Sequence, residues 1–266
     1  LLARTSKFDI RAIRPRPWQR PVVVDSIHLH RPGFFVQSWL VLQKDIRIEL
    51  RTGEIVVTGG FFGALLAVLT SIAFYTPGWV DSSGRVVAGG SDRLAPGAIW
   101  LATAFSAVLA IGRTWQRERE DGALEALLAA TISRPALFLG KALGVLLFLL
   151  TIDAVVVPLV ALLLHLDLVR TGGPLLLLLV LAAIGVAAAG TLFGAMTVRT
   201  RARELVLAAV LFPLLSPTLV LGVSATRELI GGADLIELVD SIRLLVMFDV
   251  LFVVGGALLF DTVLDA

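Results

Sequence analysis

The 266 residues contain no cysteine, one tyrosine and three histidines, and only 17% of them are charged. Without cysteine the chain has no disulfide, no thiolate nucleophile and no sulfur ligand for a metal ion. Charged residues make up about 25% of a typical soluble domain, so this composition does not suit a water-exposed surface. The net charge of +2 gives no indication of nucleic-acid binding, and we expect no nucleic-acid partner.

Apolar residues are what the chain has in abundance. They make up 57% of it, and the mean hydropathy is +0.91, whereas soluble domains have about 45–50% apolar residues. A membrane span needs roughly 20 apolar residues to cross about 30 Å of hydrocarbon. Six stretches qualify: 55–75, 94–112, 136–166, 174–198, 205–225 and 242–260. We therefore expect an all-α, polytopic membrane protein with six transmembrane helices.

Two further segments precede the first span. Residues 1–37, which include "RAIRPRPWQRP", contain prolines where a helix interior would not tolerate them, so we expect a flexible cytoplasmic tail without a signal peptide. The remainder, 38–266, is expected to form one six-span domain. It opens with apolar residues at spacings of three and four that predict an amphipathic helix in the membrane interface: Trp39, Leu42, Ile46 and Leu50.

The basic residues indicate the orientation in the membrane, because cytoplasmic loops carry an excess of lysine and arginine. Eleven fall on one side and five on the other. The richer side holds Lys44, Arg47, Arg51, Arg113, Arg117, Arg119, Arg134, Lys141, Arg199, Arg201 and Arg203. We expect this side and both termini to be cytoplasmic, with external loops at 76–93, 167–173 and 227–241.

The longest cytoplasmic segment between two spans is a charged island, "RTWQREREDGALEALLAATISRP", at 113–135. Read as a helix, it places an acidic stripe on one side and leucines on another. Gly122 weakens such a helix by about 1 kcal/mol relative to alanine, so an outside contact is expected to hold it. The alternatives are a solvated helix on the lipid headgroups and a docking element for a protein; acidic residues suit an anionic leaflet poorly.

The charged island and three other stretches resemble segments of known transport proteins. "REREDGALEALLAATISRPALFLGKALG" resembles the cytoplasmic loop of ABC-type exporter permeases that contains the coupling helix. Three further stretches are similar to the haem exporter protein B (CcmB) family of cytochrome c maturation: "KDIRIELRTGEIV", "VRTRARELVLAAVLFPLLSPTLVLG" and "MFDVLFVVGGALLF". Together the four cover about 39–264 in the order of the family, whereas the tail has no counterpart.

The resemblance implies a permease domain that is not itself an enzyme, in a bacterial inner membrane. ATP would be hydrolysed by a separate cytoplasmic ATP-binding subunit, and the other partners would be a haem-handling membrane subunit and a periplasmic haem chaperone. The chain agrees, since "RPALFLGKA" lacks the first glycine and the Ser or Thr of a phosphate-binding loop. Haem would be the cargo of the complex and not a bound cofactor of this chain, which would either move haem across the bilayer or only transmit motion.

A coupling helix at about 117–129 would transmit the motion of the ATP-binding subunit through contacts that differ between nucleotide states. The residues expected to make those contacts are Arg117, Glu118, Arg119, Glu120, Asp121, Gly122, Leu124, Glu125, Leu127 and Leu128. An ABC-type permease for another cargo, such as a drug or a lipid, would use the same segment.

Two acidic residues, Asp153 and Asp249, fall inside predicted spans, where a carboxyl group costs about 2.5–3.5 kcal/mol on insertion scales. Each is expected to be protonated or bonded to a hydroxyl of a neighbouring helix. The functional alternative is a proton or substrate pathway, as in an ion-coupled secondary transporter. No G-x-G-D motif of an intramembrane aspartyl protease surrounds either residue.

The remaining candidates are few. His165, at the outer end of the third span, is the histidine best placed for haem iron, but a polar residue at a helix end is the simpler interpretation, and we expect no metal site. Pro213 and Pro217 are expected to kink or break the fifth span, and the kink is either a hinge or only a feature of the shape of the helix. Pairs of glycines four residues apart predict close helix packing: Gly59 and Gly63, Gly140 and Gly144, Gly190 and Gly194.

Overall fold

The computed structural model describes residues 33–73, 79–80, 86–87, 94–120, 132–197 and 203–265. These form seven helices and a hairpin of two short antiparallel strands. The elements are α1 (Phe34–Thr52), α2 (Glu54–Ala73), β1 (Trp79–Val80), β2 (Val86–Val87), α3 (Ala95–Glu120), α5 (Arg134–Leu164), α6 (Leu168–Thr197), α7 (Arg203–Ile230) and α8 (Val239–Asp265). Six of the helices, all except α1, are long and apolar enough to cross a membrane, which confirms the expected all-α, six-span architecture.

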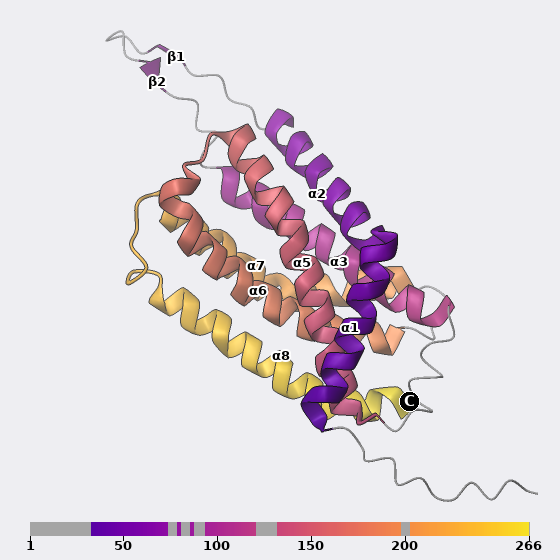
Figure 1. Cartoon of the computed structure of the whole chain (residues 1–266). Coiled ribbons are helices and arrows are strands. Elements are labelled where there is room, and N and C mark those ends of the chain that lie inside the picture. Colours follow the sequence, from indigo (N-terminus) through magenta and orange to yellow (C-terminus); the bar gives the residue numbers. More distant parts are fainter. Residues whose placement is uncertain are drawn as a thin grey trace, which may run out of the picture. The chain divides into compact units, whose positions relative to one another are not determined.

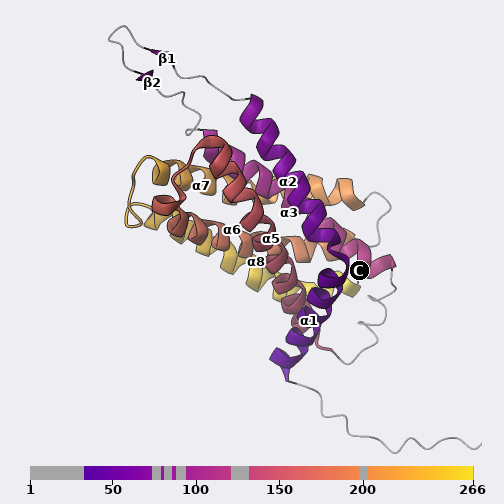
Figure 2. The same cartoon turned by 45° about the horizontal axis from the view of Figure 1, so that its top comes forward.

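Helix α5 lies at the centre of the arrangement (Figures 1 and 2) and contacts α1, α2, α3, α6 and α8. Helix α6 packs against α7 and α8, and α3 packs against both α2 and α7. Most of α3 and α6 is buried, whereas α2, α7 and α8 expose mainly apolar side chains. Apolar residues on the outside are what a bundle surrounded by lipid requires.

The glycine pairs lie where helices approach each other closely, as the sequence predicts. A Cβ atom on Gly63 of α2 would lie 2.7 Å from the Ser106 hydroxyl of α3 and 2.7 Å from the Val156 side chain of α5. The same holds for Gly194 of α6, which faces the Trp115 ring of α3. Small residues thus bring the helices together, which is how packing stabilises helix contacts in lipid.

One span begins earlier than the sequence indicates. Helix α6 starts at Leu168 and passes through Pro174, so the expectation of an external loop over 167–173 is wrong. The physical reason is a cap, because Asp167 Oδ1 accepts hydrogen bonds from the backbone N–H groups of Val169 (3.0 Å) and Arg170 (3.3 Å). Only a short turn therefore separates α5 from α6.

Like α6, the two other spans with an internal proline are continuous helices. Helix α5 continues through Pro158, and α7 continues through Pro213 and Pro217. Pro217 cannot donate a backbone hydrogen bond to the carbonyl of Pro213, but the Ser216 hydroxyl donates to that carbonyl at 2.7 Å. The serine within "PLLSP" therefore provides the hydrogen bond that the Pro213 carbonyl loses to Pro217. A hinge at these prolines stays a prediction.

Candidate functional site

A cluster of four charged side chains joins three helices at one end of the bundle. We call Lys44, Asp45, Glu118 and Lys141 the ion cluster; they come from α1, α3 and α5. The Lys141 Nζ atom lies 2.9 Å from Asp45 Oδ2 and also donates to Glu118 Oε1. Lys44 Nζ lies 3.2 Å from Asp45 Oδ1 and donates to the same Glu118 oxygen. Two cations thus share two carboxylates.

The ion cluster is deeply buried, although its members are charged. Lys141 is only 1% exposed and the two carboxylate side chains 5–6%, whereas Lys44 is 31% exposed. Burial alone would lower the pKa of Lys44, but the carboxylates of Asp45 and Glu118 outweigh it and raise that pKa above its ordinary value. Lys44 therefore remains a cation throughout the neutral pH range.

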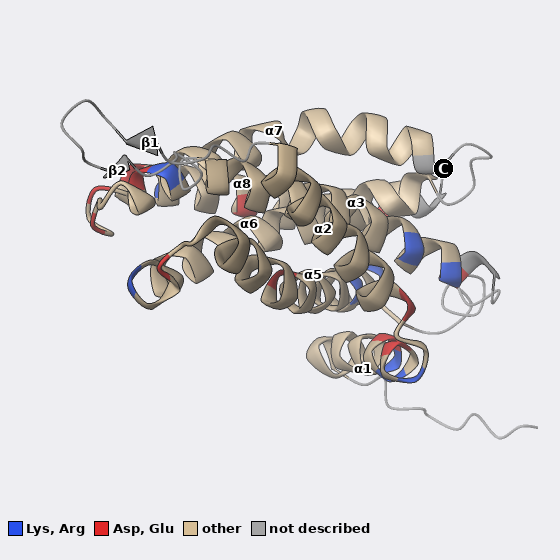
Figure 3. Cartoon of the chain, turned by 90° about the horizontal axis from the view of Figure 1, so that it is seen from above, with Lys and Arg blue, Asp and Glu red and all other residues tan. Residues whose placement is uncertain are grey.

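A glycine of α5, Gly140, allows α1 to pack closely against α5. A Cβ atom on Gly140 of α5 would lie 2.7 Å from the Ser38 carbonyl oxygen and 2.7 Å from Val41 Cβ, so any larger residue would push α1 away. The side of α1 that carries Asp45 and Glu49 faces α5 and is buried, while Trp39 is 60% and Leu50 85% exposed. Figure 3 shows charged residues gathered around α1 and the adjoining end of α3.

Glu49 adds a second connection at the same end of the bundle. Gly53 ends α1 in the left-handed conformation with φ of 63°, which turns the chain sharply into α2. The Glu49 Oε1 atom accepts hydrogen bonds from the backbone N–H groups of Ile55 (2.8 Å) and Val56 (2.9 Å), and Glu49 thus caps the start of α2. Its other oxygen lies 3.2 Å from Arg117 Nη1 of α3. One carboxylate thus fixes α1, α2 and α3 together.

Helix α1 holds both described flanks of the charged island. On the first flank, Arg117 and Glu118 near the end of α3 are bonded to Glu49 and Lys44. On the second flank, Ser133 donates from its backbone N–H (2.8 Å) and its hydroxyl (3.0 Å) to the Gln37 side-chain oxygen. Both described flanks of the island are therefore joined to α1 by hydrogen bonds or ion pairs.

The structure describes only part of the island itself. Arg117 and Glu118 are bonded to residues of the same chain, and Arg119 and Glu120 belong to the last turn of α3. The others lie outside the described residues: Asp121, Gly122, Leu124, Glu125, Leu127 and Leu128. Their contacts with a partner stay a prediction, as does the expected tail, of which residues 1–32 are not described.

Sequence reasoning missed the inward-facing members of this site. From the sequence, Lys44 and Lys141 are predicted only as basic residues on one side of the membrane, and neither Asp45 nor Glu49 is singled out. The available signal was Lys141, which directly follows Gly140 within an apolar run. A lysine at a close-packed position needs a buried carboxylate partner.

The two intramembrane acids lie on different elements, and no hydrogen bond joins them within the described chain. Asp153 of α5 is 4% exposed and accepts a hydrogen bond from the Thr103 hydroxyl of α3 at 2.8 Å. Asp249 of α8 is 6% exposed and lies against α6, where a Cβ atom on Gly185 would be 2.6 Å from its Oδ1. The hydroxyl bond expected from the sequence is thus present at Asp153.

His165 is part of a helix end. It lies directly after α5 with φ of 58°, and its backbone N–H bonds to the Ala161 carbonyl. The imidazole is exposed, and the described residues contain no group of three metal-ligating side chains. His28 and His30 lie outside the described residues. The geometry accounts for His165 as a capping residue.

Comparison with known proteins gives consistent matches along the bundle. Residues 36–258 match the model of the CcmB protein family. The chain is 31% identical to "Heme exporter protein B" of Paracoccus denitrificans, over 73% of this chain and 84% of the relative. It is also 31% identical to the protein of that name from Bradyrhizobium diazoefficiens, over 72% of this chain and 82% of the relative. The match covers nearly all of α1 and most of α8, and it includes only the last two residues of the tail.

Proposed function

Because the chain belongs to the CcmB protein family, we propose that it is the membrane permease subunit of an ABC-type complex that serves haem export during cytochrome c maturation. The observation that carries the proposal is the match over 36–258 together with relatives named "Heme exporter protein B". The six spans supply the membrane domain that such a subunit requires.

The proposed role of the charged island is to receive motion from a separate ATP-binding subunit in the cytoplasm. The sequence of this chain has no phosphate-binding loop of its own. The ion cluster supports the proposal because it provides a rigid connection behind the island. Separating buried, mutually paired charges is costly, so α1, α3 and α5 respond together when the segment between α3 and α5 is displaced.

The proposed location is the bacterial inner membrane, with both termini and the island in the cytoplasm. The excess of basic residues on that side supports this orientation. Several described elements meet at the same end of the bundle, since Arg134 at the start of α5 lies 2.9 Å from Asp261 near the end of α8. An even number of spans returns the chain to the side on which it entered.

The proposed partners follow from the role in haem export. They are the ATP-binding subunit, a haem-handling membrane subunit and a periplasmic haem chaperone. Haem is proposed as the cargo of the complex, and ATP is proposed to bind the partner.

The experiment is to purify the tagged chain from native membranes in mild detergent, identify the proteins that accompany it by mass spectrometry, and record the haem absorbance of the eluate. The proposal predicts an ATP-binding subunit together with haem-handling proteins and a haem Soret band. An ATP-binding subunit with proteins of drug or lipid export would contradict the haem assignment. The absence of any ATP-binding subunit would contradict the permease assignment and favour an ion-coupled transporter.

A further inference from the structure

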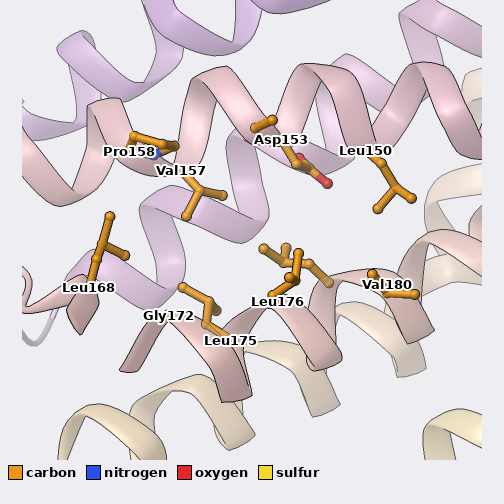
Figure 4. Close-up of a pocket in the computed structure, with 11 residues that line it drawn as sticks. Leu150, Asp153, Val157, Pro158, Leu168, Gly172, Leu175, Leu176 and Val180 are labelled. Atoms are coloured by element: carbon orange, nitrogen blue, oxygen red, sulfur yellow. The ribbon is translucent and has the colours of Figure 1, made fainter. Parts of the chain in front are cut away.

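A cavity of about 310 Å³ lies between α5 and α6, away from the ion cluster. From α5 it is lined by residues between Leu150 and Pro158, and from α6 by residues between Leu168 and Val180. The α6 segment begins directly after the turn that connects the helices, and the α5 segment lies in the second half of α5, so the cavity lies toward the end of α5 opposite Lys141. Figure 4 shows the side chains of both helices facing the space between them.

The lining is apolar except at one position. Leucine, valine, alanine, proline and glycine make up the wall, and Asp153 is its one ionisable residue. Leu176 at the rim is 59% exposed, so the cavity is open to the lipid that surrounds the bundle. An apolar wall that opens toward lipid fits a hydrocarbon chain.

Asp153 places a hydrogen-bond acceptor without a partner in this wall. Thr103 satisfies Asp153 Oδ1, but Asp153 Oδ2 is buried and has no hydrogen-bond partner among the described residues. Figure 4 shows this carboxyl group pointing from α5 toward α6. A buried acceptor without a partner costs about 1–3 kcal/mol.

We infer that this cavity binds an amphiphile with a hydrogen-bond-donating head, a hydroxyl or a protonated amine, and an apolar tail. The head donates to Asp153 Oδ2, and the tail lies along the leucines and Val180 of α6. The site is independent of the charged island and of the cargo proposed above. It gives Asp153 a ligand-binding role that requires no proton transport.

The test uses the purified protein, with the subunits that accompany it, in lipid nanodiscs. The probe is a medium-chain alcohol that carries a photoreactive diazirine in its tail, and labelled peptides are identified by mass spectrometry. We expect saturable labelling within 150–158 and 168–180. An analogous diazirine alkane without the hydroxyl should label these segments weakly, and equal labelling by the alkane would overturn the proposal.

Competition with unlabelled compounds distinguishes the two headgroups. Displacement of the probe by the parent alcohol or by the alkylammonium of the same length supports the proposal, and the stronger competitor identifies the head. Displacement by neither overturns it.

Two adjacent glycines provide a matched pair of variants. Gly172 lines the cavity, and a Cβ atom there would meet only Leu168 Cβ, at 3.9 Å; Gly173 does not line the cavity, and a Cβ atom there would meet nothing within 4 Å. Gly172→Leu should fill the cavity and abolish saturable labelling, whereas Gly173→Leu should leave it unchanged. Equal labelling in both variants would overturn the proposal.

Asp153 itself is tested by two substitutions. Asp153→Asn keeps an acceptor oxygen and should retain binding. Asp153→Leu removes it and should weaken binding roughly tenfold, the equivalent of about one hydrogen bond. If Asp153→Leu does not fold, the glycine pair and the alkane probe still decide the question. Unchanged affinity in a folded Asp153→Leu protein would overturn the role of the carboxyl group.

Discussion

Two buried ionisable residues of the same central helix, α5, lie in opposite environments. Near the start of α5, Lys141 is paired with Asp45 and Glu118 from two other helices. Twelve residues later, about 18 Å along the helix, Asp153 has a single neutral partner, the Thr103 hydroxyl. An ammonium group held by carboxylates from two other helices connects those helices and fixes their positions, whereas a carboxyl group with one neutral partner remains available to a ligand from outside. We therefore assign a mechanical role to the first region and a binding role to the second.

The largest effect is expected when the paired region loses its central cation. Lys141→Met leaves the carboxylates of Asp45 and Glu118 buried with only Lys44 to compensate them. Breaking a buried ion pair from one side typically costs about 3–5 kcal/mol. We expect a clearly lower thermal unfolding midpoint of the purified protein in detergent, and detachment of α1 detected by faster proteolysis between α1 and α2.

The matched control is Lys44→Met, the same substitution in the same cluster. Lys44 is 31% exposed, and Lys141 still pairs with both carboxylates after its removal, so we expect a loss of about 1 kcal/mol or less. If both variants had equal stability, the ion cluster would not be the connection between α1, α3 and α5.

The smallest effect is expected at the other intramembrane acid. Asp249→Asn keeps the shape of the side chain against Gly185, and Asp249 Oδ1 has no hydrogen-bond partner to lose among the described residues. We expect the unfolding midpoint and the level of mature cytochrome c in cells to match the wild type. A complete loss of cytochrome c with normal folding would instead indicate a proton-carrying role and would favour an ion-coupled transporter.

The spans could be predicted from the sequence because each is decided by local composition. Runs of about 20 apolar residues identify membrane helices without knowledge of their neighbours, and the glycine spacing predicts where they approach. The start of α6 could not be found in this way, because proline is most common at the first turn of a helix. Pro174 therefore appeared to mark the start, although Asp167 caps the helix earlier.

The ion cluster was harder to predict because its members are far apart in the chain. Asp45 and Lys141 are 96 residues apart, and Glu118 and Lys44 are 74 apart. Which charges meet depends on the packing of α1 on Gly140 and on the length of α3. The cavity beside Asp153 could not be predicted from the sequence either, since it depends on how α6 packs against α5 after the short turn between them.

The central claim, that the charged island receives motion from an ATP-binding subunit, has one direct measurement. The 266 residues contain no cysteine, so Leu128→Cys creates a single thiol for a photoreactive maleimide. Leu162→Cys, at a 75% exposed position toward the other end of α5, is the control. The account predicts that the label on residue 128 crosslinks to the ATP-binding subunit in native membranes, with a yield that changes on addition of ATP, and that the control does not crosslink to that subunit. Crosslinking of residue 128 to lipid alone, or with the same yield in every nucleotide state, would contradict it.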